Sequence, residues 1–320
     1  MGGLPARGLI ASATTPCMII SASYKTDIPA FYGEWFMNRL RAGHCKVPSP
    51  YNRTVRHVSL RPDAVDGFVF WTKNAGPFME HLPEIHHLGY PFILQYTINA
   101  YPRALEQAVV SPGKATADVR RISERFGPRV CVWRYDPVID SSLTRRDHHL
   151  RSFSRTAASL EGCVDEVVVS FARFFRKTLR NMNAAAARND FTWDEPGDEW
   201  KNGLARELAE VAASHRIRLT VCGQPRHVPP GCDEARCVDA GRLSDVAGRP
   251  IDARVRGTRN DCACFEMFDI GEYDTCPHGC AYCYAVENRS LAIRRHALHD
   301  PTGESILPRA GTAGGLPPAA

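Results

Sequence analysis

The sequence predicts an α/β fold in which a parallel sheet forms a partial TIM-type barrel. Short apolar runs rich in β-branched residues alternate with helix-compatible segments, and polar residues follow most of the runs. Near-continuous hydrophobicity over about four to seven residues is typical of strands that are buried on both faces. Such runs begin at Met18, Gly67, Phe92, Arg129, Glu166 and Ile217. Because strand–helix alternation favours parallel pairing, we expect a barrel of about six or more strands.

The segments between these runs have the residue spacing of amphipathic helices. Residues 30–43 follow a proline and end at Gly43, and glycine is a typical helix stop. Residues 118–127 and 204–215 place apolar side chains at helical spacing, and residues 285–299 have a similar character. These segments are long enough to connect parallel strands, which supports the predicted fold class.

Polar side chains at the ends of the predicted strands indicate where a ligand would bind. The carboxyl ends of parallel strands form the mouth of an α/β barrel, so side chains placed there converge. For each residue taken singly, the start of a loop is the competing explanation. The residues expected at this mouth are Thr26, Asp27, Lys73, Asn74, Gln95, Asn99, Arg134, Asp136, Cys222 and Gln224.

Composition limits the class of protein. The chain of 320 residues is 44% apolar and 23% charged, which is ordinary for a globular cytosolic protein. The net charge of +5 is too small to indicate nucleic-acid binding by itself. No run of about 18 apolar residues and no secretory hydrophobic segment is present, so we expect a cytoplasmic protein without a membrane span.

We expect four parts along the chain. They are a flexible N-terminal tail at 1–17, the barrel body at 18–224, a cysteine-rich cluster-binding segment that completes the barrel mouth at 225–295, and a C-terminal tail at 296–320. Between residues 225 and 260 periodicity is weak, with one short helix expected near Leu243. Long irregular connections are usually functional or held by a ligand.

The cysteines indicate metal binding rather than disulfides. Eight of the twelve lie between Cys222 and Cys283, in a long chain without a secretory signal. In a reducing compartment such a cluster more often binds metal. The stretch "TCPHGCAYCYA" holds Cys276, Cys280 and Cys283 in a C-x3-C-x2-C pattern. A structural zinc site wants four ligands and a cubane normally takes four thiolates, whereas this loop offers three.

The three cysteines and Tyr282, the aromatic before the last of them, resemble the radical S-adenosylmethionine (radical-SAM) superfamily. The resemblance implies a 4Fe–4S cluster on Cys276, Cys280 and Cys283, with S-adenosylmethionine on the open iron. It also implies a deoxyadenosyl radical that abstracts hydrogen from an unknown substrate, and a reductant such as ferredoxin or flavodoxin. Gly279 permits a tight backbone near the cluster. The alternative is a zinc or redox site with His278, Cys262 or Cys264 as the fourth ligand.

The position of the triad departs from the superfamily, which places it after the first barrel strand. We therefore expect a circularly permuted barrel that still delivers the cysteine loop to its mouth. From about Ile19 to Leu307 the chain more closely resembles an uncharacterised bacterial family, through "SYKTDIPAFY", "FVFWTKN", "LQYTIN", "WRYDP" and "CACFEMFDIGEYDTCPHGCAYCYA". A looser resemblance of "FWTKN" and "WRYDP" to the spore photoproduct lyase branch would imply nucleic-acid repair.

The resemblance also implies roles for residues at the strand ends. The glycine-rich "GGE"-like strand end that binds the methionine amino group is not visible, so other strand-end groups are expected to replace it. We expect Lys73, Arg134 and Asp136 to be catalytic, and Thr26, Asp27, Asn99 and Tyr282 to bind the cofactor. A cation such as Lys73 or Arg134 suits the methionine carboxylate, and a structural salt bridge is the competing role.

Four further cysteines are predicted to form a second metal site, either an auxiliary iron–sulfur cluster or zinc. They are Cys222, Cys237, Cys262 and Cys264, with Cys232 as a substitute for Cys237. The others are expected to be ordinary thiols: Cys17, Cys45, Cys131 and Cys163.

A hypothesis from another class competes with the enzyme. The C-terminal cysteines would hold zinc or an iron–sulfur cluster that stabilises a nucleic-acid-binding or structural protein without radical chemistry. The basic segments at Arg145 and Arg173 are compatible with it, although a solvated helix face is the simpler explanation.

Overall fold

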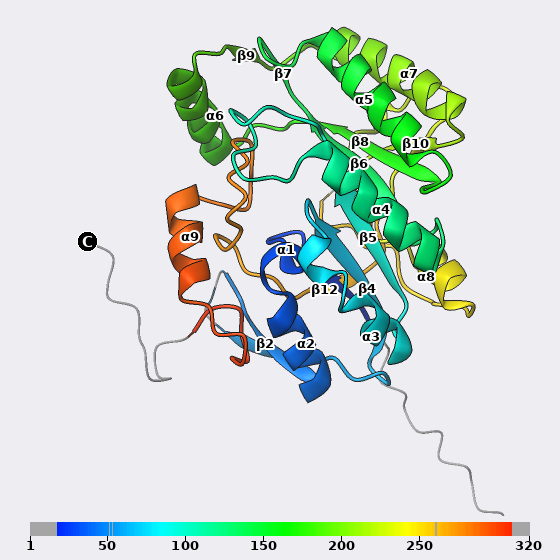
Figure 1. Ribbon diagram of the computed structural model, residues 1–320, viewed down its shortest axis with the longest axis vertical. Coiled ribbons are helices and arrows are strands. Elements are labelled where there is room, and N and C mark those ends of the chain that lie inside the picture. Colours follow the sequence, from blue (N-terminus) through cyan, green and yellow to red (C-terminus); the bar gives the residue numbers. More distant parts are fainter. Residues whose placement is uncertain (1–17, 51, 53, 260, 309–320) are drawn as a thin grey trace, which may run out of the picture.

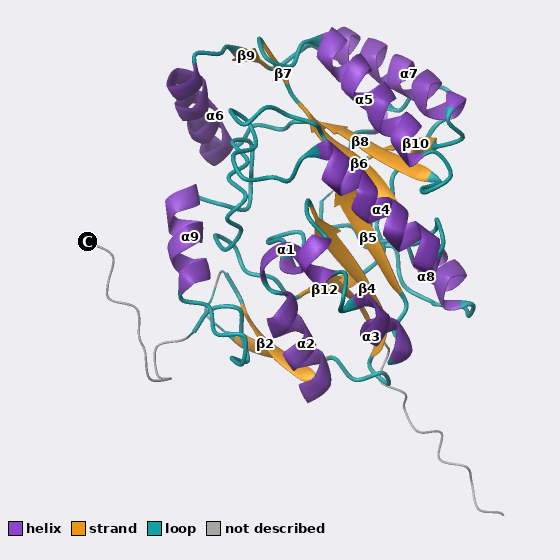
Figure 2. Cartoon of the chain, in the orientation of Figure 1, coloured by secondary structure: helices purple, strands orange, loops and turns teal. Residues whose placement is uncertain are grey.

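A computed structural model describes residues 18–50, 52, 54–259 and 261–308. Its centre is an eight-stranded sheet in which every pair of neighbours is parallel (Figures 1 and 2). Across the sheet the order is β11 (Asp233–Glu234), β10 (Arg218–Val221), β8 (Glu166–Phe171), β6 (Cys131–Val138), β5 (Phe92–Thr97), β4 (Val65–Thr72), β1 (Met18–Ala22) and β12 (Met267–Asp269).

The predicted α/β class with a parallel sheet is confirmed. The six apolar runs are the six inner strands β1, β4, β5, β6, β8 and β10. The edge strands β11 and β12 are only two and three residues long, which is too short for a hydrophobic pattern to reveal them. Among the described residues β11 and β12 do not pair with each other, so the sheet stays open and forms no closed barrel.

The helices connect the strands and mostly lie where the sequence predicts them. They are α1 (Ile28–Phe31), α2 (Gly33–Ala42), α3 (Leu82–His87), α4 (Pro112–Phe126), α5 (Arg146–Leu160), α6 (Arg176–Asn189), α7 (Asp198–Ser214), α8 (Ala240–Ala247) and α9 (Arg289–Ala297). The helix predicted at 30–43 is divided at Tyr32 into α1 and α2, and it ends at Gly43 in the left-handed conformation. The short helix expected near Leu243 is α8.

Two antiparallel pairs lie outside the main sheet. β2 (His44–Pro48) pairs with β3 (Val55–Ser59), and β7 (Asp140–Ser141) pairs with β9 (Trp193–Asp194). Neither pair was predicted, since these segments are short and mostly exposed or half-buried.

The two faces of the sheet are covered differently. On β5, Phe92, Leu94 and Tyr96 pack with the helices in the larger core, whereas Ile93 packs in a second core with α8 and residues 235–267. Gln95 points to the same side as Ile93 and donates from Nε2 to the Cys237 carbonyl (2.8 Å). The connection after β10 that looked irregular in sequence therefore covers the second face of the sheet.

The residues after α9 pack against the body of the protein. The Trp35 indole donates to the Gly303 carbonyl (3.0 Å), the Lys46 amide donates to the Glu304 carbonyl (2.8 Å), and Ile306 is buried in the larger core. The expected N-terminal tail at 1–17 lies outside the described residues, as does the part of the expected C-terminal tail (296–320) from residue 309 onward. Of the helices in the described ranges, none combines the length and apolar character needed to cross a membrane.

The buried imidazole of His149 predicts a loss of stability on acidification. One ring nitrogen hydrogen-bonds the Tyr135 hydroxyl (2.8 Å) and the other the Ile139 carbonyl (3.0 Å), which suits a neutral ring. Burial lowers the pKa of His149 to about 4. Between this value and the ordinary pKa of about 6.5, the unfolded chain binds a proton that the folded chain excludes, so stability falls as pH falls. The expected cost at about pH 5 is roughly 2 kcal/mol.

Urea unfolding at about pH 7 and about pH 5 checks this expectation. His149→Gln removes the titration, so its free energy of unfolding should change by roughly 2 kcal/mol less between these pH values than that of the wild type. The matched control is His87→Gln, because His87 is exposed, and it should keep the wild-type difference. Equal pH dependence in His149→Gln and wild type would contradict the assignment.

Candidate functional site

The cysteine loop reaches the mouth of the sheet because β12 is tied to the loop after β1. The carboxylate of Asp269, at the end of β12, accepts hydrogen bonds from Ser21 Oγ (2.7 Å), Ser23 Oγ (2.9 Å) and the amides of Tyr24 and Gly271 (both 3.0 Å). A Cβ on Gly271 would lie 2.0 Å from Ser23 Oγ, so only glycine fits there. The loop that follows β12 therefore starts beside the carboxyl end of β1.

The cysteine loop then docks on the segment after β5. Backbone hydrogen bonds join the amide of Ala108 to the His278 carbonyl (2.9 Å) and the amide of Ala281 to the Leu105 carbonyl (2.9 Å). Gly279 lies between them with φ of 73°, and a Cβ there would lie 2.4 Å from Arg289 Cδ. The expectation that this glycine permits a tight backbone is confirmed.

The three triad cysteines line one pocket of about 330 Å³ that also contacts α6 and α9. The two helices flank the loop in Figure 1. Burial raises the pKa of Cys276, Cys280 and Cys283, and Lys73 partly opposes this rise at Cys280. Within the described part of the chain, no group of three or more His, Cys, Asp or Glu side chains is arranged to hold a metal ion as it stands.

A polar network lies beside Cys280. The Lys73 ammonium contacts Glu106 (2.8 Å) and the Tyr282 hydroxyl (3.1 Å), and Asn99 Nδ2 donates to both Glu106 (3.2 Å) and Tyr282 (3.1 Å). Burial lowers the pKa of Lys73, but the negative charges of Glu106 and Cys280 raise it by more, so the pKa lies above its ordinary value. The structure thus brings together Lys73, Asn99 and Tyr282, three of the predicted site residues.

Glu106 was not predicted, although it is the acceptor that joins this network. Glu106 is buried and lies seven residues beyond Asn99, in the same loop. The predicted site residues were taken from the ends of strands, and Glu106 is too far from the end of β5 to be among them. The one signal for it in the sequence is that a carboxylate in an otherwise apolar and basic loop needs a cationic partner when buried.

Asp27 organises a second group of predicted residues. Its Oδ2 accepts from the amide of Lys73 and contacts His278 Nε2 (both 2.7 Å), and its Oδ1 caps α1 through the amide of Ala30 (3.0 Å). His278 Nδ1 and Thr26 Oγ1 are both buried without a hydrogen-bond partner. Because such groups are costly unless paired, these two atoms are suited to a ligand.

Arg134 and Asp136 bond each other and turn toward a different set of thiols. Arg134 Nη1 donates to Cys237 Sγ (2.9 Å) and Gln95 Oε1 (3.2 Å), and Nη2 donates to Asp136, which also accepts from Ser170 Oγ. Burial raises the pKa of Asp136, but Arg134 and Ser170 lower it below its ordinary value overall. Arg134 therefore has protein partners for its charge, as the salt-bridge alternative requires.

The four cysteines predicted for a second site come together, and we call them the thiol ring. Cys237 and Cys222 have their Sγ atoms 3.4 Å apart. Cys264 is buried in the same core cluster as these two, and Cys262 packs against that cluster. The neighbouring Cys264 thiol lowers the pKa of Cys262 to about 6. Cys232 packs against the larger core instead, so it does not substitute for Cys237.

The remaining strand-end residues have structural roles. Gln224 makes two hydrogen bonds with the backbone of Phe171 (2.8 and 3.0 Å), and Asn74 Oδ1 accepts from the Gly76 amide (3.2 Å). Cys45, Cys131 and Cys163 are buried thiols without a metal-ligand partner set in the described residues, and Cys17 lies outside those residues.

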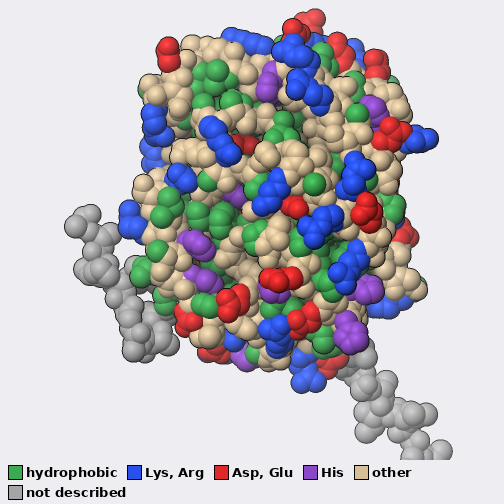
Figure 3. Space-filling model, in the orientation of Figure 1, with side chains coloured by type: hydrophobic (Ala, Val, Ile, Leu, Met, Phe, Trp, Pro, Cys, Tyr) green, Lys and Arg blue, Asp and Glu red, His purple; other side chains and the backbone are tan. Residues whose placement is uncertain are grey.

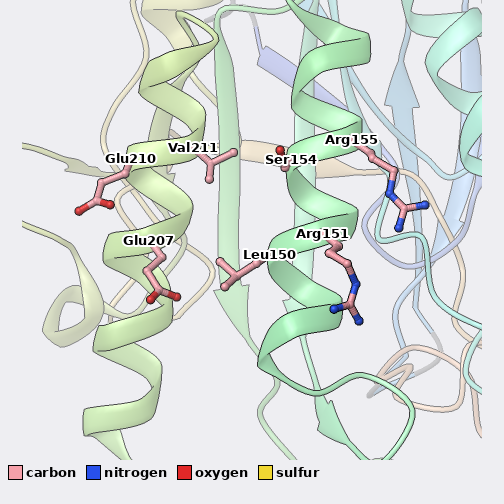
Figure 4. Close-up of a pocket in the computed structure, with 7 residues that line it drawn as sticks. All are labelled: Leu150, Arg151, Ser154, Arg155, Glu207, Glu210 and Val211. Carbon is pink, nitrogen blue, oxygen red and sulfur yellow. The ribbon is translucent and has the colours of Figure 1, made fainter.

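The surface offers no concentrated alternative site in the view of Figure 3. Lys and Arg side chains are spread over that face with Asp and Glu among them. A groove of about 530 Å³ runs between α5 and α7, and Leu150 and Val211 face each other across it (Figure 4). Its other lining residues are Arg151, Ser154, Arg155, Glu207 and Glu210, which mix both charges and include no cysteine.

Comparison with known families places the chain. The family model described as a domain of unknown function, DUF1848, matches residues 19–285. The chain belongs to the DUF1848 family. The DUF1848 match begins in β1 and ends two residues after Cys283, so it includes both the sheet and the cysteine loop. The predicted membership of an uncharacterised family is confirmed. No match was found among curated proteins.

The Lys73–Glu106 pair predicts a large effect of one substitution on stability. Their side chains are 14% and 4% exposed, so Glu106→Gln leaves a buried ammonium without its carboxylate. Breaking a buried pair from one side typically costs about 3–5 kcal/mol.

The free energy of unfolding in urea provides the measurement. The matched control is Glu304→Gln, which breaks the more exposed Lys46–Glu304 pair (2.5 Å) and should cost less than about 1 kcal/mol. A cost below about 1 kcal/mol for Glu106→Gln would show that the Lys73–Glu106 pair does not contribute to stability as a buried ion pair.

Proposed function

We propose that this DUF1848 protein is a radical-SAM enzyme that holds a 4Fe–4S cluster on Cys276, Cys280 and Cys283. One observation carries the proposal. The three thiols of a C-x3-C-x2-C loop line a single pocket beside α6 and α9, and no fourth cysteine lines it among the described residues. Three thiolates on a cluster that normally takes four leave one coordination position for a small ligand.

The residues present fit such a group. Thiols are the ligands that iron–sulfur clusters use, and the left-handed Gly279 keeps the loop narrow where it turns. Lys73 supplies positive charge beside Cys280, which favours its thiolate form. Each thiolate of a cubane binds a different iron, so the cysteines need not converge on one point.

The order of strands in the open sheet also supports a circularly permuted arrangement. The cysteine loop follows β12, which is the edge strand of the parallel sheet, and β1, β4, β5, β6, β8 and β10 continue from that edge in chain order. In space the loop therefore follows the first strand of the series, as the superfamily arrangement requires, although in sequence it comes last.

The bound groups would supply one-electron cleavage of S-adenosylmethionine to a deoxyadenosyl radical. The chain's own residues bind and orient. Asp27 holds His278 through Nε2, and the unpartnered atoms His278 Nδ1 and Thr26 Oγ1 would be available to bind polar groups of the cofactor. Asn99, Lys73 and Tyr282 hold Glu106, and this network gives the site a fixed hydrogen-bonding wall.

The proposal predicts that deoxyadenosine production needs Cys280. The protein would be purified without oxygen, reconstituted with iron and sulfide, reduced and mixed with S-adenosylmethionine. Wild type should release deoxyadenosine, whereas Cys280→Ala should fall to background and lose iron. Cys163→Ala is the matched control because Cys163 is a buried thiol away from the pocket, and it should behave as wild type.

Other outcomes separate the hypotheses. Wild type with a full iron load but no deoxyadenosine would leave a cluster and remove the radical chemistry. Zinc bound to the triad, with no iron uptake, would favour a metal-stabilised binding or structural protein.

A second prediction concerns His278. If its Nδ1 hydrogen-bonds the cofactor, His278→Ala should weaken S-adenosylmethionine binding by roughly tenfold, the worth of one hydrogen bond. Iron content should stay at the wild-type level, since the three thiols remain. Equilibrium binding to the reconstituted protein measures the dissociation constant, with exposed His87→Ala as the control. Unchanged binding in His278→Ala would remove this residue from the site.

A further inference from the structure

We propose that the thiol ring is a second metal site, and that it takes a single tetrahedral ion of the zinc class through four thiolates. This inference is independent of the radical chemistry proposed for the triad. It rests on the arrangement of Cys222, Cys237, Cys262 and Cys264, together with the charged groups around them.

The ring joins three segments that are far apart in sequence. Cys222 follows β10, Cys237 follows β11, and Cys262 and Cys264 precede β12. The thiols of Cys222 and Cys237 are in direct contact, with their Sγ atoms 3.4 Å apart. Cys264 is buried in the same core cluster, and Cys262 packs against that cluster. Four cysteines with this reach match the number of ligands that a structural zinc site requires.

The spacing of the sulfurs favours one ion over a cubane. Zinc–sulfur bonds of about 2.3 Å in a tetrahedron place ligand sulfurs roughly 3.8 Å apart. The Sγ atoms of Cys222 and Cys237 are 3.4 Å apart, close to that separation. A cubane binds each thiolate on a different iron, which spreads the sulfurs further. The sulfurs of Cys222 and Cys237 now contact each other, so an ion would replace this contact, and the four thiols would turn toward it by rotation about their Cα–Cβ bonds.

Two guanidinium groups contact the ring, which suits four thiolates on a divalent ion, and one of them, Arg134, is also paired with Asp136. Buried Arg134 donates to Cys237 Sγ (2.9 Å), and Arg259 Nη2 lies 3.8 Å from Cys222 Sγ. The amide of Val238 donates to Cys264 Sγ (3.4 Å). Thiols that serve only as small apolar core groups have no need of two guanidinium groups, whereas metal thiolates are typically hydrogen-bonded in their outer shell.

Two glycines let the backbone close around the ring. A Cβ on Gly257 would lie 2.1 Å from the Cys262 carbonyl oxygen, and Gly223, next to Cys222, has φ of 59°. The loop that carries Cys262 and Cys264 is thereby held against the end of β10. A bound ion would clamp the segment that covers the second face of the sheet to the strands beneath it.

The test separates the ring from the triad. A full-length variant with Cys276, Cys280 and Cys283 all changed to Ala would be purified with zinc, and its metal content measured. We expect one zinc ion per chain, lost when Cys237→Ala is added and kept when Cys232→Ala is added. Cys232 is the matched control because it lies in the same connection but outside the ring.

A spectroscopic measurement on a protein with all four ring cysteines tests the site even if the ring variants do not fold. In the triad variant, X-ray absorption should show zinc with four sulfur neighbours at about 2.3 Å. Cobalt substitution should give the visible bands of a tetrahedral thiolate site.

Three results would overturn the proposal. They are a triad variant that binds no metal, iron accompanied by acid-labile sulfide in the triad variant, and zinc retained after Cys237→Ala. None of them depends on deoxyadenosine release, so failure here and failure of the proposed function are distinguishable.

Discussion

The hydrogen bonds to Asp269 are the constraint on which the rest of the structure depends. One carboxylate at the end of β12 holds two serine hydroxyls and two backbone amides. One of these groups belongs to β1 itself and two belong to the turn after it. The ion pair with Lys25 (3.4 Å) compensates its buried charge. Because β12 has only three residues, its ladder alone is a weak anchor. The Asp269 contacts place the cysteine loop at the sheet mouth, where its side chains meet Asp27, Lys73 and Glu106.

Much of the fold follows from local sequence pattern. The six inner strands are largely buried on both faces, and such strands show near-continuous apolar runs such as "FILQYT" in β5. β11 and β12 were not predicted, because a segment of two or three residues shows no hydrophobic periodicity. They form because they pair with β10 and β1 in the folded protein. Whether the sheet closes depends on its two edges, and no residue pattern within a strand encodes that.

The candidate site divides in the same way. The triad could be predicted from the sequence because Cys276, Cys280 and Cys283 lie within eight positions of one another. The second group of cysteines could be predicted because these residues are crowded into one part of the chain. The roles of Glu106 and His278 depend on partners 33 and 251 positions away, and such contacts leave no local trace. Arg134 shows the limit of residue type alone. It is a cation at a strand end, yet its partners Asp136 and Cys237 direct it to the thiol ring.

The pairing of β1 with β12 has a consequence for biosynthesis. β1 precedes the other strands of the sheet in the chain and can pair with β4 once both are made, but Ser21 and its partner Asp269 are 248 positions apart. Until β12 is made, one edge of β1 lacks its neighbour, and unpaired strand edges invite association with other chains. The strand that covers this edge immediately precedes the cysteine loop, so the contacts that complete the sheet there also hold the three thiols at its mouth.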